Sequence, residues 1–85
     1  MIYSVYIVRC KDKTLYTGYT NNLEKRIHDH NFSKIGAKYT RARRPVRLVY
    51  SENYRTLSKA LKREIAIKKL SRIEKLLLIK NKTAK

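Results

Sequence analysis

Cysteine, proline, glycine and acidic residues are all scarce in this chain of 85 residues. The one cysteine, Cys10, has no partner for an internal disulfide and no second cysteine with which to form a zinc finger or knuckle. We therefore expect neither disulfides nor structural zinc to stabilise the fold, and this cysteine usage predicts a cytoplasmic protein. Two glycines and one proline predict few loops and no flexible linker.

Long apolar segments are missing as well. The longest apolar run, Leu76 to Ile79, has four residues, whereas a membrane span needs roughly 18. The apolar start of the chain, Ile2 to Val8, lacks the basic residues and the small-residue cleavage site of a signal peptide. We therefore expect a soluble protein with no membrane partner.

Basic residues greatly outnumber acidic ones. The chain has 22 Lys and Arg against 6 Asp and Glu, which gives a formal net charge of +16 at pH 7. This excess predicts a polyanionic partner. Hydrophobic residues make up 42% of the chain, which excludes a disordered basic tail. We expect one domain at residues 1–80, followed by a basic frayed tail at residues 81–85.

The first third of the chain predicts a hairpin and a helix. Two segments, Ile2–Arg9 and Thr14–Tyr19, are rich in β-branched and aromatic residues and flank a short polar turn, as in a β-hairpin. Leu23 and Ile27 then recur at i,i+4, with Phe32 close to the same stripe. This spacing predicts an amphipathic helix over residues 23–31.

The last half predicts one strand and two helices. The segment Val46–Tyr50 has β character. Thr56 can cap the start of a helix, and the apolar residues of that helix include Leu57, Ala60, Leu61 and Ile65. Ser71 and Glu74 have the spacing of a capping box, which predicts a last helix through Ile79. The predicted element order is β-β-α-β-α-α, a basic α/β domain.

The segment between the first helix and the third strand, residues 33–45, has no helical or strand periodicity. It carries five basic residues and no acid, with a tyrosine among them. We expect a basic arm that contacts nucleic-acid phosphates and offers a ring for stacking on an unpaired base. Its candidate nucleic-acid-binding residues are Lys34, Lys38, Tyr39, Arg41, Arg43 and Arg44. A second basic surface is expected on the helix after Thr56, at Lys59, Lys62, Arg63, Lys68 and Lys69.

Two tripeptides on the predicted hairpin carry a family resemblance. Ser4-Val5-Tyr6 and, ten residues later, Tyr16-Thr17-Gly18 resemble the paired tripeptides of the GIY-YIG nuclease family. The two tyrosines and Gly18 are kept, while Ser4, Val5 and Thr17 depart from the usual residues. Three further residues follow in the family's order, namely Arg26, His30 and Glu64. The chain is thus similar to the short, single-domain branch of the family, related to structure-specific and excision-repair endonucleases.

The resemblance implies both a fold and an activity. The implied fold is α+β, a three-stranded antiparallel sheet flanked by helices. The implied activity is a metal-dependent DNA endonuclease, in which Glu64 holds one divalent cation, Mg²⁺ or Mn²⁺, and water attacks a phosphodiester. No small-molecule cofactor is expected. Weak sequence specificity would suit a role in DNA repair or recombination on nicked, branched or flapped DNA, or targeting by a protein partner.

The chemistry of the individual residues agrees with these roles. Arg26 and His30 are neighbours at i,i+4 on one helix face. A guanidinium there suits a phosphate oxygen, and His30 is a candidate proton shuttle or hydrogen-bond donor. Periodicity places Glu64 on or beside the buried stripe of its helix, so its carboxylate needs a basic side chain or a metal as partner.

The tyrosines and the glycine have simpler alternatives. A strand tyrosine usually packs on its sheet, and a phenol is a poor base at neutral pH unless a cation lowers its pKa. By resemblance, one tyrosine, with Tyr6 favoured, deprotonates or orients the attacking water, and the other, Tyr16, binds phosphate. Gly18 is expected to have a structural role, because a residue without a side chain allows a strand bulge or the close approach of another backbone.

Two other functions remain open. A non-catalytic nucleic-acid-binding module could keep the fold and the charge without turnover. A ribosome-associated basic protein fits the composition but does not explain the set formed by the two tyrosines, the arginine, the histidine and the glutamate; tighter binding to RNA than to DNA in matched salt would favour it.

Overall fold

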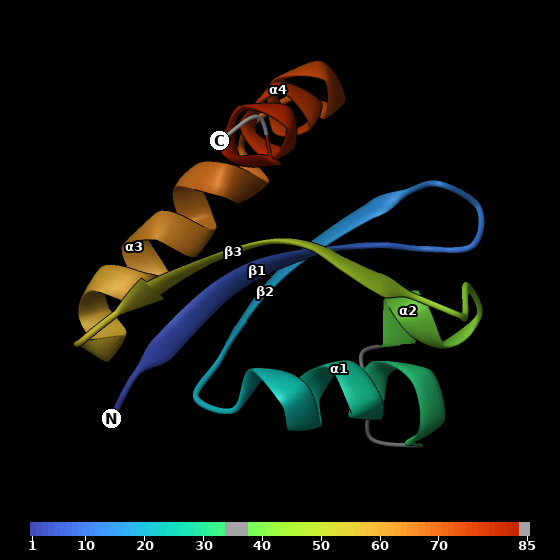
Figure 1. Cartoon of the computed structure of the whole chain (residues 1–85), viewed down its shortest axis with the longest axis horizontal. Coiled ribbons are helices and arrows are strands. Elements are labelled where there is room, and N and C mark those ends of the chain that lie inside the picture. The colour runs from blue at the N-terminus through green and yellow to red at the C-terminus, as the bar shows by residue number, and fades with distance from the viewer. Residues whose placement is uncertain (34–37, 84–85) are drawn as a thin grey trace.

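Three antiparallel strands form a sheet with helices on both faces (Figure 1). The computed structural model describes residues 1–33 and 38–83. The strands are β1 (Tyr3–Arg9), β2 (Leu15–Thr20) and β3 (Arg47–Tyr54), and β1 lies in the middle of the sheet. The α+β fold and the three-stranded antiparallel sheet are therefore confirmed.

The helices divide between the two faces of the sheet. Figure 1 shows α1 (Leu23–Phe32) and α2 (Lys38–Arg41) on one side, and α3 (Leu57–Lys68) and α4 (Arg72–Thr83) on the other. Side-chain caps begin three of them. Asn22 accepts a hydrogen bond from Lys25 N at 3.2 Å at the start of α1. The two predicted caps are present as well: Thr56 caps α3, and Ser71 and Glu74 form the capping box of α4. None of the described helices is long and apolar enough to cross a membrane.

The central strand supplies both hydrophobic cores. Val5 and Ile7 point to the face of α3 and α4, where Tyr50, Ala60 and Ile67 complete one buried cluster. Tyr6 and Val8 point to the face of α1, with Cys10 and Val46. All four of these β1 side chains are fully buried. Because a strand alternates its side chains between faces, a continuous apolar segment is what a strand covered on both sides requires.

A carboxylate on β3 attaches α3 to the sheet. Arg63 of α3 donates hydrogen bonds from Nε and Nη2 to the two oxygens of Glu52, at 2.9 and 3.0 Å. The hydroxyl groups of Tyr50 and Tyr54 also donate to this carboxylate. Burial by itself raises the pKa of Glu52, but these hydrogen bonds, that of Arg63 foremost, outweigh burial and hold the pKa below its usual value.

Several predicted bounds and faces were wrong. The strand predicted to end at Tyr50 continues to Tyr54, because β1 offers backbone partners up to Tyr3. The helix predicted to end at Ile79 continues to Thr83, where Lys82 donates to Ser51 O and lies over the Tyr50 ring. Residues 81–83 of the expected tail are thus helical.

The buried face of α3 also differs from the prediction. Ala60, Glu64 and Ile67 are its buried residues, whereas Leu57 and Ile65 are 41% and 53% exposed. Ala60 and Glu64 lie on the stripe as predicted, while Ile67 completes the buried face in place of Leu57 and Ile65. On α1, Phe32 is 74% exposed and packs against the His28 ring instead of the core.

Replacing Glu52 with Gln should destabilise the fold by about 2 kcal/mol, because Arg63 and two tyrosines lose a charged acceptor in a half-buried position. Urea denaturation measures the free energy of unfolding. The control is Glu74→Gln, which removes the same charge and leaves a residue that still fits a capping box. Equal stability of the two variants would contradict this role of Glu52.

Candidate active site

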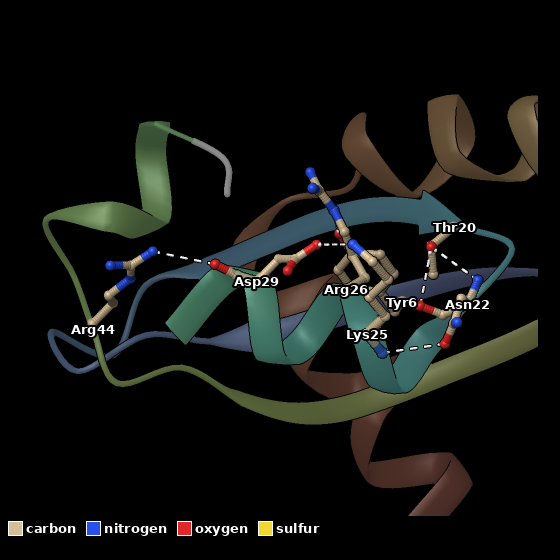
Figure 2. A network of polar contacts seen from close by, with 7 residues as sticks. All are labelled: Tyr6, Thr20, Asn22, Lys25, Arg26, Asp29 and Arg44. Carbon is tan, nitrogen blue, oxygen red and sulfur yellow. Dashed lines mark hydrogen bonds and ion pairs between the residues drawn. The ribbon is translucent and has the colours of Figure 1, made fainter. Parts of the chain in front are cut away.

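The hydroxyl group of Tyr6 joins β1 to α1 at the centre of the candidate site. It lies 2.8 Å from His30 Nε2, and it accepts a hydrogen bond from Arg26 Nε at 3.3 Å. Arg26 and His30 are one turn apart on α1, so the adjacency expected from their spacing is present. Figure 2 shows Arg26 reaching from α1 to the Tyr6 ring.

His30 is fully buried, and both of its ring nitrogens have partners. Nδ1 lies 2.7 Å from Oγ1 of Thr40, which is also fully buried. Burial, reinforced by the positive charges of Arg26 and Arg44, lowers the pKa of His30 to about 4. The imidazole is therefore neutral at pH 7, and one ring nitrogen donates while the other accepts.

Thr40 was not among the residues singled out in the sequence. It belongs to α2, a four-residue helix within the segment that predicted no regular structure. A helix this short has no room for an apolar repeat, and no sequence motif includes this threonine. Its role depends on the fold bringing it to His30, ten residues earlier.

The second tyrosine lies against the same histidine. Tyr16 of β2 pairs with Val8, and Gly18 pairs with Tyr6, so both tyrosines point to the α1 face of the sheet. The Tyr16 and Tyr6 rings approach the His30 ring edge-on, with centroids 5.4 and 5.7 Å away. The two rings that the sequence placed on neighbouring strands thus converge on one side chain.

Gly18 leaves room for the Tyr6 ring. A Cβ atom at this position would lie only 2.5 Å from the Tyr6 hydroxyl oxygen and 2.7 Å from the carbon that bears it. The space created by the glycine is therefore filled by a side chain, rather than by the bulge or second backbone that the sequence predicted. Any larger residue would displace the hydroxyl from His30 and Arg26.

Glu64 brings a carboxylate from α3. The residue is 9% exposed, and its nearest ionic partner is Lys68, whose Nζ is 3.5 Å from Oε2 and whose side chain is half exposed. Burial raises the pKa of Tyr6 above its ordinary 10.0, the hydrogen bond from Arg26 opposes this, and the charge of Glu64 adds to it. Glu64 is therefore within electrostatic reach of the Tyr6 hydroxyl.

The donor set at Glu64 suits a hard divalent cation with few protein ligands. Within residues 1–33 and 38–83, no group of three or more His, Cys, Asp and Glu side chains could hold a metal ion. One carboxylate completed by water and substrate phosphate is a common Mg²⁺ arrangement. Within the described residues the ionic contact of this carboxylate is the long one to Lys68 at 3.5 Å, so Glu64 fits this role.

Both ends of α1 are fixed, which sets the positions of Arg26 and His30. At its start, Asn22 donates from its backbone N to Thr20 Oγ1 at 3.1 Å and caps the helix (Figure 2). At its end, Arg44 donates to the carbonyl groups of Asp29, His30 and Ser33, at 3.2 Å to Asp29 and 2.5 Å to His30. A basic side chain on the last carbonyls of a helix compensates its unpaired acceptors.

The described part of the expected basic arm, residues 38–45, is folded against the site. Arg44 bonds to α1, and Arg43 forms an ion pair with Asp12 at 3.0 Å and lies 4.1 Å over the Tyr39 ring. Tyr39 stacks on Tyr16 with centroids 5.7 Å apart, although it stays 40% exposed. Arg41 is exposed. Lys34 and the side chain of Lys38 lie outside the described residues.

Comparison with known proteins identifies the family. A model of the GIY-YIG catalytic domain matches residues 2–76. The chain belongs to the GIY-YIG family. The matched span includes the five candidate catalytic residues, Tyr6, Tyr16, Arg26, His30 and Glu64. Membership indicates nuclease chemistry, and GIY-YIG nucleases generally use a divalent metal and DNA.

The relatives are short proteins of similar length. A UPF0213 protein of Syntrophus aciditrophicus is 63% identical over 76 residues, which cover 89% of this chain and 87% of the relative. A UPF0213 protein of Clostridium perfringens is 58% identical over 81 residues, 95% of this chain and 86% of the relative. Their names state no activity.

Two solved structures share the fold. The solution NMR structure of a UPF0213 protein from Bacillus halodurans has a TM-score of 0.63 and 44% identity, covering 96% of this chain and 86% of that one. The solution NMR structure of a protein from E. faecalis has a TM-score of 0.67 and 40% identity, covering 100% and 90%. Both agree with the family expected from the two tripeptides.

The neutral state of His30 makes stability depend on pH. Its pKa is about 4 in the folded protein against an ordinary 6.5, so the unfolded chain binds a proton first as the pH falls. The contribution of neutral His30 to the free energy of unfolding is complete above pH 6.5. As the pH falls from 6.5 to 4, about 3 kcal/mol of this free energy is lost. Urea denaturation across this range measures it. His30→Gln should flatten the dependence; identical slopes for both proteins would contradict the burial of a neutral imidazole.

Proposed function

We propose that this chain is an endonuclease that hydrolyses phosphodiester bonds in DNA with one divalent metal ion, Mg²⁺ or Mn²⁺. The observation that carries the proposal is the Tyr6 hydroxyl held between His30 Nε2 at 2.8 Å and Arg26 Nε at 3.3 Å. A phenol oxygen between a neutral imidazole and a cation suits the transfer of a proton from an attacking water. The family supports the same chemistry.

In the proposed reaction, water gives a proton to the Tyr6 oxygen while Tyr6 gives its own proton to His30 Nε2. This needs His30 to carry its proton on Nδ1, where it donates to Thr40 Oγ1 and leaves Nε2 as an acceptor. Burial raises the pKa of Tyr6 and lowers that of His30 to about 4, so both are neutral in the free protein. Tyr6 is neutral before and after this relay, so the positive charge of Arg26 would favour the transfer by stabilising the hydroxide that forms, rather than by ionising the phenol.

The charge that grows on the phosphate needs stabilising groups from several elements. Arg26 makes one side-chain hydrogen bond within the described residues, from Nε, which leaves its terminal nitrogens for a phosphate oxygen. Tyr16, half-buried beside His30, is assigned the second contact to phosphate. A divalent ion held by Glu64 would supply Lewis-acid neutralisation of the same phosphate.

We propose that the enzyme selects DNA by structure rather than by sequence. Lysine and arginine contacts to phosphates position a duplex but carry no sequence information. A net charge of +16 on 85 residues favours such contacts. Nicked, branched or flapped DNA, as in repair or recombination, is the substrate class we infer. Equal cutting of all these forms and of plain duplex would instead require a protein partner for targeting.

Glu64→Gln should abolish metal-dependent cleavage while DNA binding persists. The expected loss in rate is at least about 100-fold, because the carboxylate that holds the cation is gone. The assay measures nicking of supercoiled plasmid and cleavage of branched, nicked and flapped duplexes, with Mg²⁺, Mn²⁺ or EDTA. Glu74→Gln, which removes an equal charge on the exposed surface of α4, serves as the control and should cut normally.

Three other results would contradict parts of this proposal. Tight binding by the wild-type protein with no cleavage under any metal would identify a non-catalytic nucleic-acid-binding module. Tighter binding to RNA than to DNA in matched salt would favour a ribosome-associated role. Cleavage that survives Glu64→Gln would remove Glu64 from the metal site.

A further inference from the structure

Three exposed basic side chains gather at one end of the sheet. Arg9 ends β1, Lys11 follows it in the hairpin turn, and Arg47 begins β3. They line a pocket of about 320 Å³ together with Cys10, Pro45 and Val46. None of these residues was singled out for binding in the sequence, because they lie in separate segments that carry no run of positive charge.

The arrangement is electrostatically unfavourable in the protein alone. Arg9 and Arg47 are direct cross-strand partners, so their side chains leave the sheet on the same face. Like charges in this position repel and weaken a strand pair. No acidic residue lines the pocket, and within residues 1–33 and 38–83 none of the three basic side chains forms an ion pair or a side-chain hydrogen bond.

The walls of the pocket are held in place by the elements that build the candidate active site. Asn31 of α1 donates from Nδ2 to Val46 O at 3.0 Å and accepts from Val46 N at 2.7 Å. Lys11 N donates to Arg43 O at 2.9 Å. The pocket is therefore a formed feature of the fold and keeps a constant position relative to Tyr6, three residues from Arg9 on β1 and roughly 10 Å along the strand.

Three other arginines are already paired within the fold. Arg43 and Arg44 bond to Asp12 and to the end of α1, and Arg63 bonds to Glu52. Positive charge at this end of the sheet is therefore concentrated in side chains that have no partner in the described chain. Phosphate oxygens are the complementary ligand for two guanidinium groups and an ammonium group.

We propose that Arg9, Lys11 and Arg47 bind the phosphate backbone of the DNA substrate outside the site of cleavage. This inference extends the proposed function, because its ligand is the nucleic acid on which that function acts. Arg9 alternates with Tyr6 and Val8 along β1, so its side chain leaves the sheet on the opposite face, and a DNA backbone bound there would pass around the end of the sheet from Tyr6. The contacts would be independent of base sequence.

The test measures binding without cleavage. Affinity for a DNA duplex is determined by fluorescence anisotropy between 50 and 200 mM salt, in EDTA, for the wild type and for Arg9→Ala/Arg47→Ala. Each lost phosphate contact should reduce the slope of log K against log salt by about 0.9, so the double variant should lose about 2 from the slope and bind at least about 10-fold more weakly at low salt.

The matched control removes the same charge elsewhere. Arg55→Ala/Arg72→Ala deletes two exposed arginines away from this end of the sheet and should change the slope by less than half as much. Equal effects of the two double variants would mean that only net charge matters, and this would overturn the inference. Loss of repulsion should also keep the melting temperature of Arg9→Ala/Arg47→Ala at or above that of the wild type.

A second measurement needs no variant. Titration of the wild type with the duplex, followed by NMR, should shift the backbone amides of Lys11 and Arg47 together with those around Tyr6. Inorganic phosphate is the parallel arm; if millimolar phosphate shifts Lys11 and Arg47 and the duplex does not, the pocket binds free anions and the inference fails. Cleavage is measured separately, so an inactive protein that still passes both binding tests would sink only the proposed enzymatic function.

Discussion

The buried contact between the Tyr6 hydroxyl and His30 Nε2 is the interaction on which the site depends. It needs a central strand covered on both faces, a glycine opposite Tyr6 and a helix that presents His30 one turn after Arg26. It also needs Thr40 to occupy the far ring nitrogen. A polar pair this deep is stable only when each member has its partners, so the surrounding elements are fixed in relation to one another.

The acidic residues explain how a protein of such high positive charge holds its shape. Asp12, Asp29 and Glu52 each form a contact of 3.0 Å or less with a base, and each contact joins or stiffens elements that carry the site. Glu64 differs, because its nearest base is 3.5 Å away and half exposed. Of the four carboxylates that form an ion pair within the described residues, the one with the longest contact is thus the one that the family resemblance assigns to a metal ion.

The sequence was sufficient for the parts of the site that follow from local periodicity. The spacing of Arg26 and His30 on a helix predicted their adjacency, and the hairpin pattern predicted Tyr6 and Tyr16 on neighbouring strands. The fold class followed from the strand and helix patterns together with the family. These features depend on residues close in the chain, whose geometry is fixed by secondary structure.

The features that the sequence could not supply depend on distant contacts. Thr40 acquires its role only when α2 folds against α1. Arg43 and Arg44 looked like free phosphate contacts, but the carbonyls of α1 and Asp12 are their partners. The buried face of α3 was predicted at Ala60 and Glu64 but not at Ile67, whose burial against Val5 and Ile7 of β1 joins residues in different elements.

The most direct test of the account is the single-turnover cleavage rate of Tyr6→Phe, which removes one oxygen and keeps the ring that fills the space over Gly18. The account predicts a fall of about 100-fold or more, with DNA affinity retained, because the proton path between water and His30 is interrupted. A rate within about threefold of the wild type, which is under 1 kcal/mol in activation free energy, would show that the Tyr6 hydroxyl takes no part in the chemistry and would contradict the account.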